Sequence, residues 1–513
     1  MKKIAIVGGG ISGLTVAYAL LNPPLPPFVK GGVGGFLGKK FDVTVFEADS
    51  RAGGKIWTDK ANGFLCEKGP NGFLDNKPKT LELCAELGIE PLRSNENAKN
   101  RYIFSSGKLN LLSESPLSFL KSDLMSWRGK LRMMYELIAP KGPQDETVAD
   151  FVIRRLGKEA LDKLIDPMSS GIFAGDPYQM SIKYCFPRIK ELEQEYGSLI
   201  RAMIKLQKAK KKGSGVEGRG RKDEGRVGPA PTGALTSFYN GTQSLTDALA
   251  EKLGERVRLG VSVQALEKEG ELYRLHTSEG IVNADIVVLA TPAYTSAEIL
   301  RDFDDELSKR LEGIPYVPLS VVCSGYRRDK VGHNLNGFGF LIPHKEGRRI
   351  LGTLWDSSIF PNRAPEGYVL LRSMVGGAKS PELAMLEDNA LINTVFDELK
   401  PILSLKTEPE MVRIYRWEKA IPQYDLRHGE RLRFIDERLK SHHSLYLTGN
   451  AYRGIGMNDC IENGYRLAEE IIRLVPPDFN IPNAASTSTR TSRIAITPYT
   501  ASFFLKNIGI IAR

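Results

Sequence analysis

A glycine motif near the amino terminus constrains the fold more than any other feature of the sequence. Residues 2–7 are apolar and β-branched and predict a buried strand, whereas residues 14–20 predict a helix. Between them, Gly8, Gly10 and Gly13 have the spacing of a dinucleotide-binding loop. The first glycine permits a tight turn, the second lets the backbone approach a pyrophosphate, and the third lets the helix pack on the strand. The phosphates then lie at the helix N-terminus, where free N–H groups and the helix dipole favour anions.

A second strand is predicted at residues 42–47 and ends in Glu47, an acid suited to accept hydrogen bonds from ribose hydroxyls. Such an acid usually follows the last glycine by about 20 residues, whereas Glu47 follows Gly13 by 34. Residues 22–40 contain four prolines and five glycines, and we interpret them as an inserted surface loop that accounts for the difference. These features predict an α/β fold with a Rossmann-type domain. The alternative is a strand, a turn and a helix without a ligand.

Two further turns favour close contact between the backbone and a ligand. Gly53 and Gly54 soon follow the acid and let a second segment approach the same phosphates, with Arg51 or Lys55 as a countercharge. The segment 69–72, Gly-Pro-Asn-Gly, is the other such turn. For both segments the alternative is an ordinary turn.

Composition and charge argue against several other classes of protein. A chain of 513 residues that is 42% hydrophobic and 26% charged is long enough for two or three packed domains. Its five cysteines include no Cys-x-x-Cys, so we expect a reducing compartment and neither a disulfide framework nor a zinc site. The net charge of +10 is concentrated in residues 22–40, 205–226 and 484–513, which have the character of insertions or tails, so no nucleic-acid partner is predicted. We also expect no membrane-spanning helix and no signal peptide.

Hydrophobic periodicity predicts the elements of the remaining chain. Residues 80–206 are predicted to be mostly helical, with one helix capped by Thr147, and another helix is predicted from about Asn458. Residues 213–233 are interpreted as a charged linker, and the last thirty residues as an irregular tail. Further strands are predicted at residues 257–263, 286–290, 319–326, 338–342, 369–375 and 445–448.

The glycine motif, the acid and the two turns together resemble the flavin-containing amine oxidase superfamily. Within it, residues 167–177 and 449–461 are similar to signatures of the protoporphyrinogen and coproporphyrinogen oxidases. The resemblance extends from the first residue to about Leu474 and is interrupted at 22–40 and 208–232.

The resemblance implies a Rossmann-type FAD-binding domain, a mixed-sheet substrate domain and a helical domain. The helical domain would comprise residues 86–207, the charged linker 208–232, the substrate domain 303–411 and the tail 476–513. The FAD-binding domain would be discontinuous and comprise residues 1–85, 233–302 and 412–475.

The resemblance also carries functional residues over, position by position. It implies FAD bound without a covalent link, and we expect neither a metal site nor a catalytic side chain. Arg101 matches an arginine that pairs with a substrate propionate in relatives. The implied substrate contacts are Arg101, Gly175, Phe338, Gly339, Leu341 and Met374. The implied cofactor contacts are Gly8, Gly9, Gly10, Ile11, Ser12, Gly13, Glu47, Ala48, Arg51, Lys55, Gly69, Pro70, Asn71, Gly72, Val263, Asn450, Ile455, Gly456 and Met457.

The implied reaction is the oxidation of a porphyrinogen to a porphyrin in haem biosynthesis. FAD would accept a hydride at N5 from a bridging methylene, and molecular oxygen would reoxidise it. The substrate is large and apolar with carboxylates at its rim, which suits an apolar slot with an arginine. The helix from Asn458 would direct its positive end at the flavin. The sequence leaves open whether the substrate is protoporphyrinogen IX or coproporphyrinogen III.

Two other functions stay open: an amine or carotenoid-type flavin oxidoreductase, and a flavin-binding protein without turnover. Residues 116–138 are apolar and basic and either dock on a membrane surface, as in relatives, or form a helical lid. We expect a cytoplasmic protein, with peripheral contact at the inner face of the membrane and a homodimer as further options. Residues 240–243, Asn-Gly-Thr-Gln, depart from the Gly-Gly-Met-Gln of relatives. Cys460 is expected to be a small buried thiol rather than a covalent flavin attachment.

Overall fold

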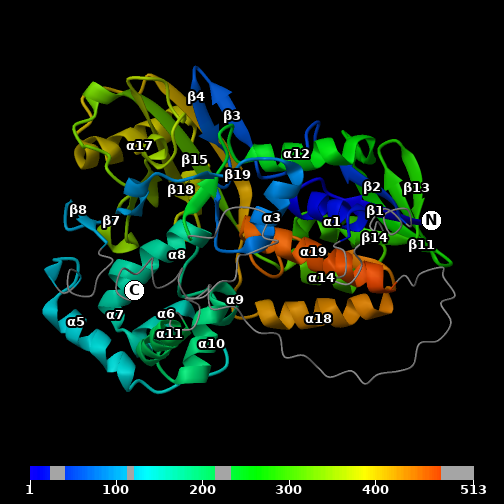
Figure 1. Cartoon of the computed structure of the whole chain (residues 1–513), viewed down its shortest axis with the longest axis horizontal. Helices are drawn as coiled ribbons and strands as arrows, with labels where there is room; N and C mark the ends of the chain where they lie inside the picture. The colour runs from blue at the N-terminus through cyan, green and yellow to red at the C-terminus, as the bar shows by residue number, and fades with distance from the viewer. Residues whose placement is uncertain (24–40, 113–118, 120, 214–232, 475–513) are drawn as a thin grey trace.

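The structure is a computed structural model, which describes residues 1–23, 41–112, 119, 121–213 and 233–474. Two large sheets and a group of helices form its main parts (Figure 1). Most of the 22–40 insertion, residues 214–232 of the linker and the tail lie outside the described residues. Residues 208–213, predicted to belong to the linker, are instead the end of a helix, so the linker prediction is wrong for them.

The first large sheet has five parallel strands in the order β10-β2-β1-β14-β20. The central strand β1 (Lys2–Val7) pairs with β2 (Phe41–Glu47) and β14 (Ile286–Leu289), and all three strands lie where the sequence predicted strands. The edge strands are β10 (Val257–Leu259) and β20 (Leu445–Leu447). Three distant parts of the chain therefore meet in one sheet.

Both faces of this sheet are buried, which explains the continuous apolar run of β1. Ile4 and Ile6 face a cluster that includes helices α1 (Ile11–Leu21), α12 (Gln243–Leu253) and α19 (Met457–Leu474) (Figure 1). Ala5 and Val7 belong to a second cluster, on the opposite face, with residues of α13 (Ala293–Leu300), α14 (Asp305–Glu312) and α18 (His428–Ser441). Helix α19 begins one residue before the predicted start at Asn458.

The second large sheet has seven strands in the order β19-β15-β18-β17-β16-β7-β8. The long strands β15 (Tyr316–Arg327), β18 (Tyr368–Gly376) and β19 (Met411–Pro422) form an antiparallel half. The short strands β17 (Gly352–Leu354) and β16 (Gly339–Leu341) continue it. Strands predicted at 319–326, 338–342 and 369–375 are confirmed within one to three residues.

Part of the region predicted to be mostly helical is β structure. Strands β7 (Arg101–Ser105) and β8 (Lys108–Leu111) complete the seven-stranded sheet, and β7 pairs in parallel with β16. The helical prediction is wrong for this stretch because its partner strand follows only after the whole helical region and leaves no local signal. The single strand predicted at 257–263 is also wrong: Gly260, at φ +73°, separates β10 from β11 (Val263–Glu269).

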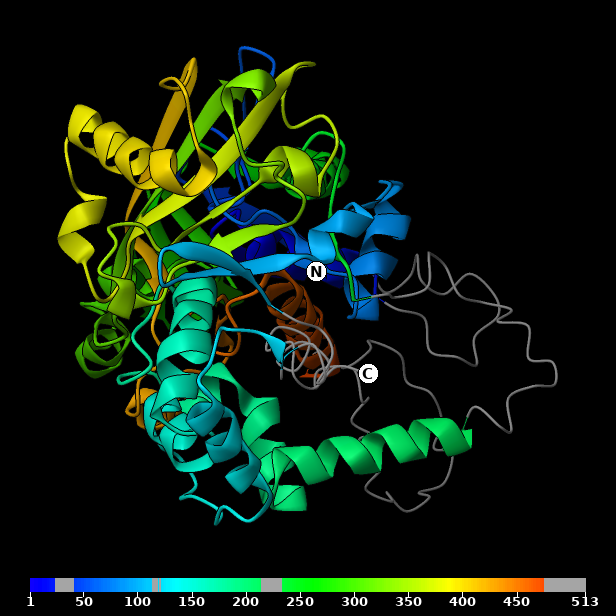
Figure 2. The same ribbon diagram turned by 90° about the vertical axis from the view of Figure 1, so that its left-hand side faces the viewer.

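The helical region contains α5 (Trp127–Met134), α6 (Val148–Arg155), α8 (Asp166–Phe173), α10 (Pro187–Tyr196) and α11 (Leu199–Gly213). Figure 2 shows α11 extending away from the two sheets. The predicted cap is confirmed, because the Thr147 hydroxyl oxygen accepts a hydrogen bond from the Asp150 N–H at 3.0 Å. Among the described residues, no helix combines the length and the apolar character needed to cross a bilayer.

Smaller elements connect these parts. The remaining α-helices of more than three residues in the described part of the chain are α3 (Pro78–Leu87), α9 (Ile182–Cys185), α15 (Asp356–Ile359), α16 (Pro381–Ala384) and α17 (Asp388–Leu403). The remaining strands are β3 (Thr58–Ala61), β4 (Phe64–Glu67), β5 (Phe73–Leu74), β6 (Leu92–Arg93), β9 (Leu235–Ser237), β12 (Leu272–Thr277) and β13 (Gly280–Ala284).

Candidate active site

A cavity of about 2250 Å³ lies where the two large sheets and the helical region meet. The carboxyl ends of the parallel strands β1 and β2 open into it, which is where ligands bind in open α/β sheets. Its lining also includes the start of α19, strands β16 and β18, and helix α8. A single space therefore reaches both the glycine motif and the seven-stranded sheet.

The first glycine motif has the geometry that the sequence predicted. Gly8 has φ +105°, and a Cβ on Gly13 would lie 2.0 Å from the Gly8 carbonyl oxygen. Gly10 lines the cavity, has open space where a Cβ would stand, and is the N-cap of α1 without a side-chain hydrogen bond. Ile11 and Ser12 also line the cavity, whereas Gly9 and Gly13 support the motif from behind. The open backbone at this N-terminus suits a phosphate.

Glu47 is held beside this motif. Its carboxylate accepts hydrogen bonds from the N–H groups of Gly9, at 2.7 Å, and Asp49, at 2.9 Å. Burial raises the pKa of Glu47, while the two backbone N–H donors oppose that rise. Ala48 and Val263 complete the wall on this side. Each carboxylate oxygen uses one backbone donor and keeps capacity for a further one, as a ribose hydroxyl would supply.

The paired glycines pack directly on the first motif. The Gly53 N–H donates to the Gly9 carbonyl at 2.8 Å, and Gly53 and Gly54 both have positive φ. Arg51 and Lys55 line the cavity, but Nη1 and Nη2 of Arg51 donate to carbonyls of its own turn. Lys55 Nζ donates to the carbonyls of Lys419 and Ala420, at 2.6 and 2.5 Å. Burial lowers the pKa of Lys55 to about 8. Their role as a countercharge stays a prediction.

The turn of residues 68–72, here called the cavity turn, lies against the paired-glycine segment. A Cβ on Gly69 would stand 2.0 Å from the Lys55 carbonyl oxygen, and one on Gly72 would stand 2.4 Å from that of Thr236. Pro70 and Asn71 line the cavity with them. The turn therefore requires both glycines to come this close to neighbouring backbone.

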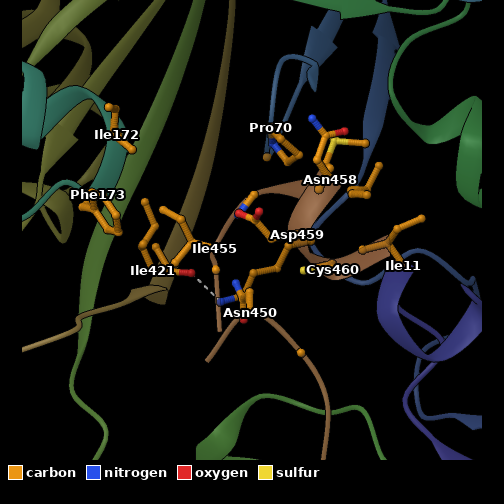
Figure 3. A pocket seen from close by; sticks show the side chains of 18 of the residues that line it. Ile11, Pro70, Ile172, Phe173, Ile421, Asn450, Ile455, Asn458, Asp459 and Cys460 are labelled. Atoms are coloured by element: carbon orange, nitrogen blue, oxygen red, sulfur yellow. Dashed lines mark hydrogen bonds between the residues drawn. The ribbon is translucent and has the colours of Figure 1, made fainter. Parts of the chain in front are cut away.

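The C-terminal segment adds a second helix N-terminus to the cavity. Residues 454–460, at the start of α19, line it, and Figure 3 shows Asn458, Asp459 and Cys460 at its wall. The Gly456 N–H donates to the Asp459 carboxylate at 3.2 Å. Tyr424 holds the preceding loop, because its hydroxyl donates to the Asn450 carbonyl at 2.5 Å and accepts from the Gly454 N–H at 3.0 Å. Burial raises the pKa of the Cys460 thiol to about 12, which fits an inert small side chain.

The other end of the cavity is apolar. Phe338, Gly339, Leu341 and Met374 line it, as does Arg101, whose guanidinium carbon lies 5.0 Å from the centre of the Phe338 ring. Gly339, at φ +134°, comes so close to β17 that a Cβ would stand 2.1 Å from the Thr353 carbonyl oxygen. Ile172 and Phe173 of α8 face Ile421 and Ile455 across this end (Figure 3).

Gly175 does not line the cavity. It is buried behind α8, where a Cβ would stand 2.6 Å from both Gln423 Oε1 and the Met180 sulfur. Its implied contact with substrate therefore has no counterpart in this geometry. The glycine instead lets the end of α8 pack on the segment that follows β19.

Sequence reasoning missed several lining residues, including Arg372, Tyr424, Ile172 and Phe173. A signal was present for Arg372, since it precedes Met374 by two positions and alternate strand residues share a face. Thr242, noted only as a departure, donates through its hydroxyl to the buried Glu67 carboxylate at 2.7 Å. That contact explains why a threonine can replace the usual methionine here.

A dinucleotide cradle at one end of one cavity and an apolar compartment at the other define an FAD-dependent oxidoreductase. The fit to FAD rests on the open Gly10 backbone, the two helix N-termini and the buried Glu47. The model for "Flavin containing amine oxidoreductase" matches residues 11–472, so the chain belongs to this family.

Relatives of known name are similar over most of this chain. It is 30% identical over 482 residues to the coproporphyrinogen III oxidase of Bacillus subtilis (strain 168), with 90% of this chain and 96% of that one covered. It is 33% identical over 492 residues to the chloroplastic protoporphyrinogen oxidase of Oryza sativa subsp. japonica, covering 91% and 87%.

Solved structures support the fold. A crystal structure from Exiguobacterium sp. 255-15, provisionally assigned as a protoporphyrinogen oxidase, superposes with a TM-score of 0.75 at 26% identity, covering 92% of this chain and 99% of that one. Reduced UDP-galactopyranose mutase shares the fold at a TM-score of 0.67 and 17% identity, covering 93% and 94%.

Proposed function

We propose that the protein oxidises a porphyrinogen to the porphyrin in haem biosynthesis, with FAD as cofactor. The observation that carries this function is the single cavity that joins the dinucleotide cradle to the apolar compartment beside Arg101. Homologues named coproporphyrinogen III oxidase and protoporphyrinogen oxidase, from bacteria and plants, support it.

The side chains of the apolar compartment suit this substrate. Phe338, Leu341 and Met374 offer an apolar surface for a macrocycle, and the Arg101 guanidinium offers donors for a carboxylate at its rim. The Arg101 guanidinium lies over the Phe338 ring, so a cation–π contact holds it against the wall of the compartment. We therefore assign Arg101 to substrate orientation.

Bound FAD supplies the acceptor for the hydride that leaves a bridging methylene of the substrate. The chain contributes orientation and electrostatics. The N-termini of α1 and α19 present positive dipole ends to the cavity, and apolar side chains of α8 and β16 line its substrate end. No side chain is assigned as a general base.

The test is to mix the purified yellow protein with a porphyrinogen and follow porphyrin fluorescence. We expect fluorescence to rise faster than in spontaneous oxidation. An enzyme that instead reduces its flavin with an amine would be a different oxidoreductase of the family, and one that retains flavin without either activity would be a binding protein. The rate of porphyrin formation is measured separately with protoporphyrinogen IX and with coproporphyrinogen III, and the faster reaction identifies the substrate.

We propose molecular oxygen as the electron acceptor. Porphyrin formation should then consume oxygen in proportion, which an oxygen electrode measures. Turnover that continues at full rate without oxygen, with an added quinone, would contradict this assignment.

We propose further that the protein docks on a membrane surface through α5. Trp127, Leu131 and Met134 of α5 are 69%, 70% and 57% exposed and recur at helical spacing along one stripe, and Lys121 and Arg128 are exposed cations close to them in the sequence. Vesicles of anionic phospholipid should sediment the wild type but not Trp127→Ser/Leu131→Ser, while Met385→Ser, at another exposed apolar site, should still bind. A doubled mass in light scattering without vesicle binding would instead identify a homodimer.

A further inference from the structure

The cavity turn is held from behind by two residues of the seven-stranded sheet region. On β18, Arg372 donates through Nε to the Glu67 carbonyl at 3.0 Å and through Nη2 to the Gly69 carbonyl. On α15, the Asp356 carboxylate accepts a hydrogen bond from Asn71 Nδ2 at 3.1 Å. The turn that faces the cofactor end is thus fixed by elements that belong to the substrate end.

Asp356 and Asn71 depend on each other. Asp356 is fully buried and does not line the cavity, whereas Asn71 does. Within the described part of the chain, the second Asp356 oxygen and the Asn71 Oδ1 have no hydrogen-bond partner. Their mutual bond therefore decides which way the Asn71 amide is turned, because no other contact selects one orientation.

The charges around Asp356 are balanced. Arg372 and Arg363 act on its carboxylate with attraction and Glu67 with repulsion, and all four side chains are buried. Burial raises the pKa of Asp356 to about 6 despite the two arginines. Burial of a carboxylate destabilises its charged form. A fully buried carboxylate whose one side-chain hydrogen bond is accepted from a cavity residue is typical of a functional position rather than of core packing.

We propose that Asp356 is a positioning residue, which sets the orientation of the Asn71 amide and so the environment that the cavity turn presents to the cofactor. The consequence for turnover rests on the proposed function, whereas the consequence for bound flavin does not. Asp356 acts through Asn71 and touches neither substrate nor cofactor.

The test compares Asp356→Asn with Asp356→Leu in the FAD-loaded protein. The asparagine keeps an oxygen that accepts from Asn71, and the leucine has a similar size without one. We expect Asp356→Leu to shift the visible absorption band of bound flavin and to lower kcat about tenfold at little changed KM. Asp356→Asn should restore both the band and most of kcat.

Two further variants separate positioning from simple support of the fold. In an Asn71→Leu background, Asp356→Leu should change the flavin band no further, because the link is already broken. The matched control is Asp304→Asn, a buried carboxylate that caps α14 outside the cavity and should lower stability without moving the flavin band.

Equal effects of Asp356→Asn and Asp356→Leu, or additive effects with Asn71→Leu, would overturn the proposal. If Asp356→Leu does not fold, Asn71→Leu alone must shift the flavin band, and an unchanged band refutes the link. A shifted band without porphyrinogen turnover in the wild type would leave the positioning role intact and count against the proposed function.

Discussion

The two ends of the cavity differ in what forms their walls: mainly backbone at the cofactor end and side chains at the substrate end. The cofactor end consists mainly of backbone: glycines that bring main chain to within contact of main chain, and two helix N-termini. The substrate end consists of side chains, with an aromatic ring, aliphatic groups and one guanidinium. Where main chain packs directly on main chain, as at Gly13, there is no room for added atoms, whereas side-chain sites can change their selectivity by substitution. The predictions below test this contrast.

The largest effect is expected where backbone meets backbone. In Gly13→Ala the new Cβ would stand 2.0 Å from the Gly8 carbonyl, so α1 must move away from β1. We expect a loss of about 4 kcal/mol in the free energy of unfolding. Purified protein should contain little flavin, measured from its absorbance. As a control, Gly10→Ala has open space and should keep its melting temperature while binding FAD more weakly.

The junction between the two ends should show a pH dependence. Burial raises the pKa of Asp356 from 3.8 to about 6, so its folded form holds a proton more tightly than the unfolded chain does. The contribution of protonated Asp356 to the free energy of unfolding is fully present below pH 4. It falls by about 3 kcal/mol as the pH rises through 6. Thermal melts of wild type and Asp356→Asn should therefore diverge in favour of the variant between pH 4 and pH 7. Parallel curves would contradict this.

A substitution at the substrate end should lower turnover of the porphyrinogen without affecting the binding of FAD. Replacing Arg101 by Ala removes a charge-assisted contact with a carboxylate, worth about 2 kcal/mol or about 30-fold in kcat/KM for a porphyrinogen. Flavin content and the absorption band should stay those of the wild type. A loss of FAD from this variant would show that the two ends are not separate.

The smallest effect is expected at Cys460. This thiol lines the cavity at the start of α19, is buried and has a raised pKa. Cys460→Ala should cost about 1 kcal/mol of stability. Acid should release FAD equally from both proteins, as seen in the supernatant. Flavin that stays attached to the wild type alone would indicate a covalent bond.

Local patterns explain why the backbone geometry at the cofactor end could be predicted, while its contacts with FAD stay a prediction. The strand, glycine turn and helix around Gly8, and the acid at Glu47, are contiguous features whose geometry follows from main-chain sterics. Arg51 and Lys55 show the limit of this reasoning. Their residue types suggested a countercharge. In the structure, Arg51 Nη1 and Lys55 Nζ donate hydrogen bonds to main-chain carbonyls, and no sequence pattern identifies these acceptors.

The substrate end could be predicted only through the resemblance. Phe338 and Met374 have the pattern of ordinary core residues, and Gly175 shows that a residue next to the site in sequence can face away from it. Asp356 was missed because its role depends on four buried charges that meet there from separate elements. Such balance exists only in the folded chain.

The hairpin of β7 and β8 has a consequence for dividing this chain. Arg101 begins β7, and β7 is held in place by β16. We propose that residues 101–111 belong with the substrate domain, although they precede the helical region. A chimera that exchanges residues 303–411 between relatives would then graft a sheet without three of its seven strands, namely β7, β8 and all but the first residue of β19. Exchange of substrate preference should require residues 101–111 and 303–422 to be transplanted together.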